Sequence, residues 1–256
     1  MNPISFVSQT SIRLRGKAIA GALDRQQKLP GFNQRAYSRA SVLCIGAGGL
    51  IGKIAPTLVR KGIGALTIVD HDIVEATNLH RQFFYPTDIG KNKAIALAAN
   101  LQRECTFATR ITGHAMAFQE AAHIGMDLAC DAVVVGVDNN MGRVAASRYF
   151  RERGIAVVFS AVSRDADSGY VFAQAQNGAC IGCIFPDIAD DQTHPCPGVA
   201  AVADILQLLG GLSIYTLDTF ITQRPRDWSF RWLHLSSAAM DSCRVVLPKQ
   251  HCGVCH

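Results

Sequence analysis

The sequence predicts an α/β fold in which a mostly parallel sheet is flanked by helices. Apolar runs of strand length recur along the chain and alternate with helical patterns, which is typical of such a sheet. The first run, residues 42–45, leads into a glycine-rich turn at Gly46, Gly48 and Gly49, and residues 53–59 follow as a helix. A strand, a glycine turn and a helix start, in that order, form a cradle for phosphate. We therefore expect a Rossmann-like core that holds a nucleotide at this turn.

Composition excludes several classes of protein. With 256 residues, 49% hydrophobic and 18% charged, the chain can bury a full core. The net charge of +5 comes without a run of like charges, so we expect no nucleic-acid partner. A signal peptide is not evident, and the apolar stretch 198–217 contains Asp204 and Gln207, which favours a buried helix over a membrane span. Nine cysteines without a secretion signal indicate a reducing compartment, so we expect a cytoplasmic protein with no membrane partner.

The glycine turn departs from the usual dinucleotide pattern at its sixth position. Ile51 stands there, and the third glycine is displaced to Gly52. Because that glycine normally permits close packing of helix on strand, we expect the helix to begin one residue late.

Asp70 ends the second apolar run, residues 65–70, about twenty residues beyond the glycines. A carboxylate at this position commonly binds the hydroxyl pair of a ribose, which makes Asp70 a candidate for nucleotide binding. The alternative is a cap of a helix or turn.

Three polar side chains between the second strand and the next helix indicate a polyphosphate. Arg81 and Gln82 follow the strand, and Lys93 stands at the start of a helix near residues 94–101. Arginine offers a fork of donors to phosphate oxygens and lysine adds a point charge, whereas an ordinary dinucleotide site needs neither. A cation at a helix start is electrostatically disfavoured, and a bound polyphosphate would offset that cost.

Asp138 follows the strand predicted over residues 132–137 and is a candidate ligand for Mg²⁺ beside the phosphates. Asn139 and Arg143 come next, and the alternative for Asp138 is the N-cap of a helix over residues 141–151. Further strands are expected near residues 106–112 and over 155–160.

The combined pattern resembles the ThiF/MoeB/HesA family of adenylating enzymes, relatives of the ubiquitin-activating enzymes. The matching pieces are Arg25 and Gln26 with residues 29–32, the glycine turn, residues 69–72, 78–82 and 90–93, and Asp138, Asn139 and Arg143. They cover residues 25 to about 145, and the resemblance continues through the paired cysteines to the C-terminus.

The resemblance implies a homodimer in which each subunit binds ATP and Mg²⁺. It implies that Arg25 reaches across to the partner's triphosphate, and that Asn78, Gln82, Asn139 and Arg143 also contact the nucleotide. We accordingly expect one continuous adenylation domain in three parts. Residues 1–40 form an N-terminal helical arm, 41–175 the ATP-binding core, and 176–256 a zinc-tied part with a crossover loop, antiparallel strands and the substrate-binding surface.

Two C-x-x-C pairs predict a structural metal site. Cys180 and Cys183 form one pair and Cys252 and Cys255 the other, and together they can supply four thiolates to Zn²⁺. Such an ion would tie the C-terminal tail back to the loop after the sheet. A thioredoxin-like redox pair is the less favoured alternative.

Cys196 is a candidate nucleophile. It precedes a predicted helix start, with His194 close by, and both features lower the pKa of a thiol. In members of the family, a loop cysteine of this kind takes part in sulfur transfer or thioester chemistry. The alternative is an inert loop cysteine.

We therefore expect ATP-dependent adenylation of a C-terminal carboxylate, the Gly-Gly tail of a ubiquitin-like β-grasp sulfur carrier, giving an acyl-adenylate and pyrophosphate. One alternative is an enzyme of the same fold that acts on a ribosomal peptide or natural-product precursor. Others are a relative of the tRNA-modifying dehydratases, an NAD-dependent oxidoreductase and a non-catalytic scaffold. Arg81, Gln82 and Lys93 argue against the oxidoreductase, and the cysteine pairs argue against the dehydratase.

Overall fold

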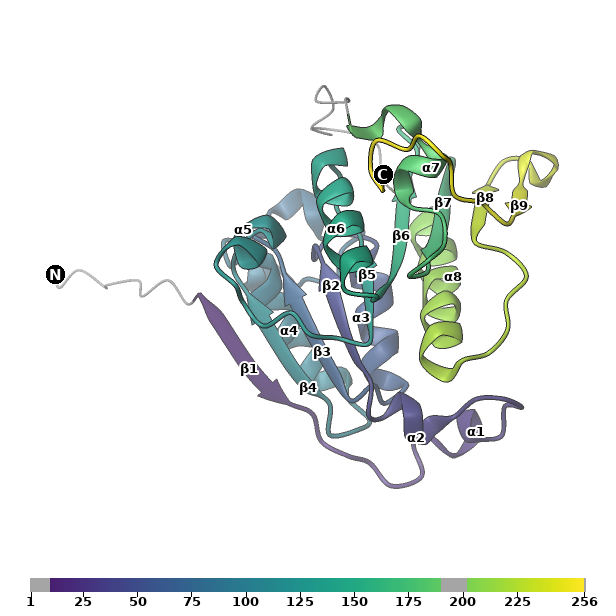
Figure 1. Ribbon diagram of the computed structural model, residues 1–256. Coiled ribbons are helices and arrows are strands. Elements are labelled where there is room, and N and C mark those ends of the chain that lie inside the picture. Colours follow the sequence, from purple (N-terminus) through teal and green to yellow (C-terminus); the bar gives the residue numbers. More distant parts are fainter. Residues whose placement is uncertain (1–9, 190–201, 256) are drawn as a thin grey trace, which may run out of the picture.

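The computed structural model describes residues 10–189 and 202–255, and these residues build a nine-stranded sheet with helices on both faces (Figure 1). The strands are β1 (Ser11–Arg15), β2 (Ser41–Ile45), β3 (Ala65–Val69), β4 (Arg110–His114), β5 (Ala132–Val135), β6 (Ala156–Val162), β7 (Ser168–Gln174), β8 (Phe230–His234) and β9 (Ser242–Arg244). The helices are α1 (Asp24–Gln27), α2 (Gln34–Tyr37), α3 (Ile51–Arg60), α4 (Lys93–Glu104), α5 (Phe118–His123), α6 (Asn140–Glu152), α7 (Ile181–Ile184) and α8 (Ala203–Thr222).

The strand order is β1-β4-β3-β2-β5-β6-β7-β8-β9. The five strands from β4 to β6 in this order pair in parallel, and β7, β8 and β9 continue the sheet with antiparallel pairings. The predicted α/β fold, parallel at its centre and antiparallel towards the C-terminus, is thereby confirmed. The parallel strands are apolar because helices cover both of their faces, and all four residues of β5 are buried.

The chain reverses its direction of travel across the sheet at β2. From β2 it proceeds to β3 and β4 on one side, and it returns to the other side of β2 with β5. In open α/β sheets, ligands bind outside the carboxyl ends of the strands at this reversal. The glycine turn follows β2 and therefore lies there.

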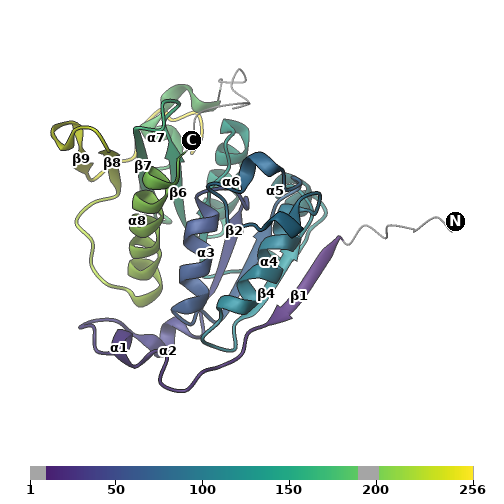
Figure 2. The ribbon, with the colours of Figure 1, turned by 180° about the vertical axis from the view of Figure 1, so that it is seen from behind.

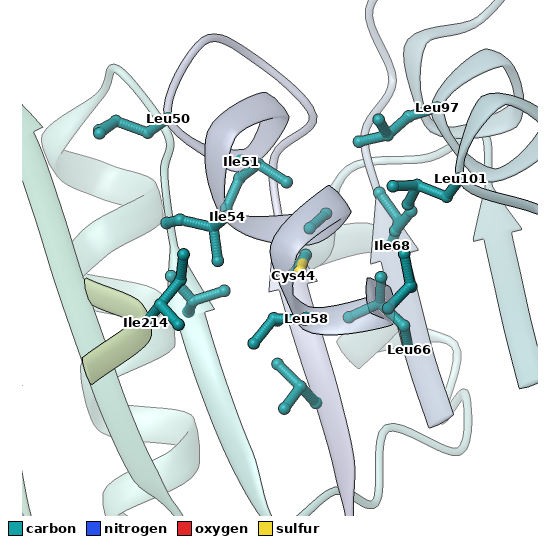
Figure 3. Packing of buried hydrophobic residues seen from close by; sticks show 14 of the residues in the cluster. Cys44, Leu50, Ile51, Ile54, Leu58, Leu66, Ile68, Leu97, Leu101 and Ile214 are labelled. Carbon is teal, nitrogen blue, oxygen red and sulfur yellow. The ribbon is translucent and has the colours of Figure 1, made fainter. Parts of the chain in front are cut away.

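Two hydrophobic cores cover the two faces of the sheet. Helices α3, α4 and α8 pack on one face (Figure 2), and α5, α6 and α7 contribute to the core of the other. Figure 3 shows α3 between α4 and α8, with Ile54 and Leu58 directed at the strands below. Both side chains are fully buried.

Ile51 is accommodated by a glycine directly after the neighbouring strand β5. Helix α3 begins at Ile51, and a Cβ placed on Gly136 would lie 2.9 Å from the Ile51 Cγ1 atom. Gly52 makes the close approach that the motif requires, because a Cβ there would lie 3.0 Å from the backbone nitrogen of Phe83. Ile51 therefore fits at the sixth position because Gly136 leaves room for it, and Gly52 makes the close backbone contact one residue later.

The N-terminal arm contains a strand that the helical expectation did not include. In β1, Ile12 and Leu14 pack against the core while the alternate residues Arg13 and Arg15 are exposed. This period of two is that of a sheet edge with one buried face. The helices α1 and α2 that follow are single turns.

Helix α8 is long and apolar enough to cross a membrane by length and composition alone. In the structure it packs against α3, β6 and β7. Ile205, Leu209 and Leu217 are fully buried there. The expectation of a buried helix in this stretch is confirmed.

We predict that Ile54→Ala lowers the free energy of unfolding by about 2–5 kcal/mol, because it leaves a cavity between α3 and the sheet. Urea denaturation measures the change. The control is Ile124→Ala at a 60% exposed position, which should alter stability by less than about 0.5 kcal/mol. Equal effects of the two substitutions would contradict the packing described for α3.

Candidate functional site

A cavity of about 300 Å³ opens at the carboxyl ends of β2, β3, β5 and β6. Eleven of the residues singled out from the sequence line it, namely Gly46, Gly48, Gly49, Asp70, Asn78, Arg81, Gln82, Lys93, Asp138, Asn139 and Arg143. Arg25 does not line it, and Cys196 lies outside the described residues. The structure therefore brings together residues that span almost a hundred positions of sequence.

The glycine turn forms one wall of the cavity. Gly46 has a φ of +94°, which is strained for any residue with a Cβ, and its N–H donates to the Val69 carbonyl at 2.9 Å. A Cβ on Gly48 would meet nothing within 4 Å, so the backbone here is open to a ligand. At Gly49 a Cβ would lie 2.7 Å from Leu206 of α8. Glycine is therefore needed for the backbone angle at position 46, for an open backbone at 48 and for close packing against α8 at 49.

Asp70 joins the glycine turn to the loop after β3. Its Oδ2 atom accepts from the Ala47 N–H at 2.6 Å, and Oδ1 accepts from the Asp72 N–H at 2.8 Å. The side chain is buried, and burial raises the pKa of this carboxyl above its usual value against the effect of both hydrogen bonds. Asp70 lines the cavity, but each of its oxygens already has one backbone donor.

Asp72 is a charged residue of the cavity to which the sequence analysis gave no role. Its carboxylate is half exposed and accepts from the Lys93 ammonium at 2.9 Å, while Lys93 is only 12% exposed. The cost of a cation at the start of α4 is therefore offset by Asp72 within the chain itself. The sequence signal that could have indicated Asp72 is its place two positions beyond Asp70, just after the same strand.

Two side chains after β3 present polar groups to the cavity. Arg81 donates from Nη1 to the Thr77 carbonyl at 2.8 Å, which fixes one side of the guanidinium. The Oε1 atom of Gln82 is buried and has no hydrogen-bond partner among the described residues. Asn78 is buried as well, and its Oδ1 accepts from the Glu75 N–H at 3.0 Å. A ligand with a donor would satisfy Gln82.

On the β5 side, Asn139 is the N-cap of α6, since its Oδ1 accepts from the Gly142 N–H at 2.7 Å. The alternative reading of Asp138 as the cap is wrong. Its carboxylate is exposed at the cavity wall, without a hydrogen bond or ion pair in the described part of the chain. Arg143 donates to the Val137 carbonyl at 2.9 Å and to Asn140 Oδ1 at 2.8 Å, which fixes its guanidinium at the segment that follows β5.

The end of β6 completes the wall with small residues, Ser160, Ala161 and Ser163. The sequence analysis did not single them out. Only their position at the end of a central strand could have indicated them.

The four paired cysteines gather in one cluster, with all four sulfur atoms within 4.8 Å of one another. The shortest separations are 3.3 Å between Cys180 and Cys252, 3.7 Å between Cys180 and Cys183, and 3.8 Å between Cys183 and Cys255. Zn–S bonds of about 2.3 Å at tetrahedral angles require sulfur separations of about 3.8 Å. The donor set and its dimensions therefore fit a tetrathiolate zinc site.

Close backbone approach allows the two cysteine loops to meet. A Cβ on Gly182 would lie 2.6 Å from Val254 and 3.0 Å from the Cys252 sulfur. Burial alone would raise the pKa of the Cys252 thiol. The backbone N–H groups of Val254 and Cys255 and the neighbouring thiols outweigh the effect of burial and lower this pKa to about 7.

Asp88 anchors the segment between β3 and α4 that carries Arg81 and Gln82. It accepts from the Tyr85 N–H at 3.0 Å, from Asn100 Nδ2 of α4 at 2.8 Å and from Lys91 Nζ at 3.1 Å. Burial alone would raise the pKa of this carboxyl, and the three donors lower it below its usual value.

We predict that Asp88→Asn destabilises the protein by about 1–3 kcal/mol at pH 7, because it sets an amide against these donors. A lowered folded pKa contributes stability that is present above the unfolded pKa of about 4 and lost as the pH falls through the folded value. The difference in the free energy of unfolding between Asp88→Asn and wild type should therefore become smaller as the pH falls. Urea denaturation between pH 7 and pH 3 measures this difference. Asp227→Asn, at an exposed aspartate, is the control. A difference that stays constant with pH would contradict the assignment.

The chain is similar to known proteins in sequence and, in a separate comparison with solved structures, in fold. The ThiF family model matches residues 23–254. The sulfur carrier protein adenylyltransferase of Thermus thermophilus is 30% identical over 195 residues, which are 73% of this chain and 72% of that protein. The ubiquitin-like modifier-activating enzyme 5 of Drosophila melanogaster is 29% identical over 198 residues, 71% of this chain and 48% of that enzyme.

Among solved structures, the ATP complex of E. coli MccB superposes with a TM-score of 0.72 at 18% identity, over 87% of this chain and 68% of that one. PaaA has a TM-score of 0.69 at 16% identity, over 96% and 78%. These two likenesses show the fold. The family model over most of the chain, together with the two relatives at 29–30% identity, identifies the chain as a member of the ThiF family and an enzyme of the adenylyltransferase class.

Proposed function

We propose that this enzyme adenylates the C-terminal carboxylate of a ubiquitin-like β-grasp sulfur carrier, using ATP and releasing pyrophosphate. The observation that carries the proposal is the convergence of the glycine turn with Arg81, Lys93 and Arg143 in one cavity. A turn that offers N–H groups and three cationic side chains together favour a triphosphate over a dinucleotide. The name of the Thermus relative supports the class of acyl substrate.

In the proposed reaction a carboxylate oxygen of the carrier attacks the α-phosphorus of ATP. A bond forms between the carboxylate oxygen and the α-phosphorus. The bond from the α-phosphorus to the oxygen that bridges to the β-phosphate breaks, and pyrophosphate leaves with the electron pair. A carboxylate is already nucleophilic at neutral pH, so no general base is needed. Catalysis then consists of positioning and of charge neutralisation.

The residues divide this work by their chemistry. The glycine turn brings backbone N–H groups to the nucleotide, and Arg81, Lys93 and Arg143 clamp the phosphates. Gln82 supplies the unpaired buried oxygen for a ligand donor. We assign the ribose hydroxyls to Asp70 together with Asp72, because the Asp72 carboxylate is the more exposed of the two in the cavity. Asn78 stabilises the loop after β3 by accepting from the Glu75 N–H, and Asn139 stabilises the start of α6 by accepting from the Gly142 N–H.

Asp138 is our candidate ligand for the Mg²⁺ that accompanies ATP. It is an exposed carboxylate beside the proposed phosphate site, and hard cations prefer such oxygens. Magnesium would neutralise phosphate charge there. Within the chain, Arg143 lies on the same helix start and supplies further positive charge.

We propose a homodimer in which Arg25 acts on the partner's nucleotide. Gln26, the next residue, donates to the Lys61 carbonyl at 2.9 Å, at the end of α3 opposite the glycine turn. The ten residues of α3 separate these two ends by about 15 Å. This separation disfavours contact between Arg25 and its own cavity and supports action across subunits.

We propose that the cysteine cluster binds structural zinc and ties the C-terminal segment to the loop after β7. Its dimensions and four thiol donors support this assignment. A tetrathiolate site requires reduced cysteines, in keeping with a cytoplasmic enzyme. The chain spans about half the length of the ubiquitin-like modifier-activating enzyme 5 of Drosophila melanogaster and of the adenylyltransferase and sulfurtransferase UBA4 of Kluyveromyces lactis. The complete activities of these two enzymes are therefore not carried over to this chain.

We predict that the enzyme exchanges labelled pyrophosphate into ATP only with a β-grasp carrier that retains its terminal Gly-Gly. Lys93→Met should slow the exchange about 10²–10³-fold, because a charge-stabilising group is lost. Lys17→Met, an exposed lysine outside the cavity, should match wild type.

ATP binding without exchange on any carrier would contradict the proposal. Exchange with short peptides instead of carriers would favour a peptide-modifying enzyme. A nucleotide-dependent spectral shift with NADH but not ATP would favour an oxidoreductase.

We further propose that the Cys196 thiolate attacks the acyl-adenylate, so that a thioester C–S bond forms, the acyl C–O bond to AMP breaks and AMP leaves. Cys196→Ala should leave pyrophosphate exchange intact and abolish transfer, whereas Cys243→Ala, at an exposed cysteine, should change neither. Product analysis by mass spectrometry separates the two steps. Unchanged transfer in Cys196→Ala would show that this cysteine is inert.

A further inference from the structure

Helix α6 runs from the cavity to the cysteine cluster. Arg143 near its start lines the cavity, and two later arginines on it reach the loops that carry the cysteines. Arg148 donates from Nη2 to the Gly253 carbonyl at 2.7 Å and from Nε to the Val254 carbonyl at 3.3 Å. Arg151 donates to the Gly178 carbonyl at 2.6 Å, just ahead of the other cysteine pair.

The two carbonyls that Arg148 holds lie in the loop between Cys252 and Cys255, two of the four clustered cysteines. The backbone N–H groups of Val254 and Cys255 lower the pKa of the Cys252 thiol. The Gly253 carbonyl shares a peptide group with the first N–H, and the Val254 carbonyl shares one with the second. In a trans peptide the C=O and N–H point in opposite directions. Arg148 therefore holds both peptide groups by their carbonyl ends, opposite the N–H groups that lower the pKa of Cys252.

We propose that Arg148 is a positioning residue for the metal site, which orients two backbone N–H groups at the Cys252 thiolate. This role rests on the zinc site proposed above. Four thiolates around Zn²⁺ carry a net charge of −2, which peptide N–H groups and a nearby guanidinium both stabilise. The planar fork of arginine spans two neighbouring carbonyls with fixed geometry, which a lysine ammonium does not reproduce.

Arg153 offers a matched control at the C-terminal end of α6. It carries the same charge, donates to the Tyr149 carbonyl at 2.9 Å and lies over the Tyr149 ring. Among the described residues it has no hydrogen bond to either cysteine loop. Replacing it removes a cation at the end of the same helix while leaving the bonds of Arg148 and Arg151 to both loops in place. A general effect of charge is thereby separated from the specific effect of Arg148.

The experiment measures zinc affinity of the full-length protein by competition with the chromophoric chelator 4-(2-pyridylazo)resorcinol. We expect Arg148→Gln to weaken affinity by about 10- to 100-fold, the range for loss of an outer-shell partner. Arg148→Lys, which keeps the charge without the fork, should fall between that variant and wild type. Arg153→Gln should equal wild type. Cobalt(II) substitution gives a second readout, since its absorption reports the thiolate ligand set.

Wild-type affinity in Arg148→Gln, or equal weakening in Arg148→Gln and Arg153→Gln, would overturn the role of Arg148. Should Arg148→Gln fail to fold, Arg148→Lys decides, and wild-type affinity in that variant overturns the role. A wild-type protein that binds no stoichiometric zinc would overturn the metal site and Arg148's role with it. Carrier-dependent pyrophosphate exchange is measured separately, so the proposed adenylation can stand or fall independently.

Discussion

The buried carboxylate of Asp70 determines how the two halves of the cavity meet. It accepts one backbone N–H from the glycine turn after β2 and another from the loop after β3, so the two loops cannot separate without leaving a buried charge unpaired. Asn92 adds a second tie, because its side-chain amide donates to the Asp70 and Asp72 carbonyls while its oxygen caps α4. The position of Lys93 at the cavity follows from these bonds.

On the other side of the sheet, α6 connects two regions with different chemistry. Its first turn borders the cavity, its middle is joined to β7 by the reciprocal hydrogen bonds of Ser147 and Gln174, and its last turns hold the cysteine loops. The C-terminal segment, although remote in sequence, therefore shares a rigid support with the proposed nucleotide site.

Much of the fold and the cavity could be predicted because both depend on local patterns. Buried parallel strands are apolar runs, and residues that follow such strands meet at one edge, which brought Asp70 and Asp138 together as expected. Strand β1 was not foreseen because its five residues alternate within a basic segment and gain their partner only from β4. The roles of Asn139 and Asp72 also escaped prediction. Which of two adjacent polar residues caps a helix, and which acid pairs with Lys93, depends on backbone angles and on approach in space.

The distance between the arm's anchor and the cavity has a consequence for how activity would depend on dilution. The Lys61 carbonyl holds Gln26 and Gln34 at the end of α3 far from the glycine turn. If Arg25 completes the cavity of a neighbouring subunit, the finished site exists only in the associated state, and its population follows mass action. Turnover per chain would then fall on dilution below the dissociation constant, although each separate chain keeps its own folded cavity. Self-association would thus act as an on-switch that needs no additional ligand.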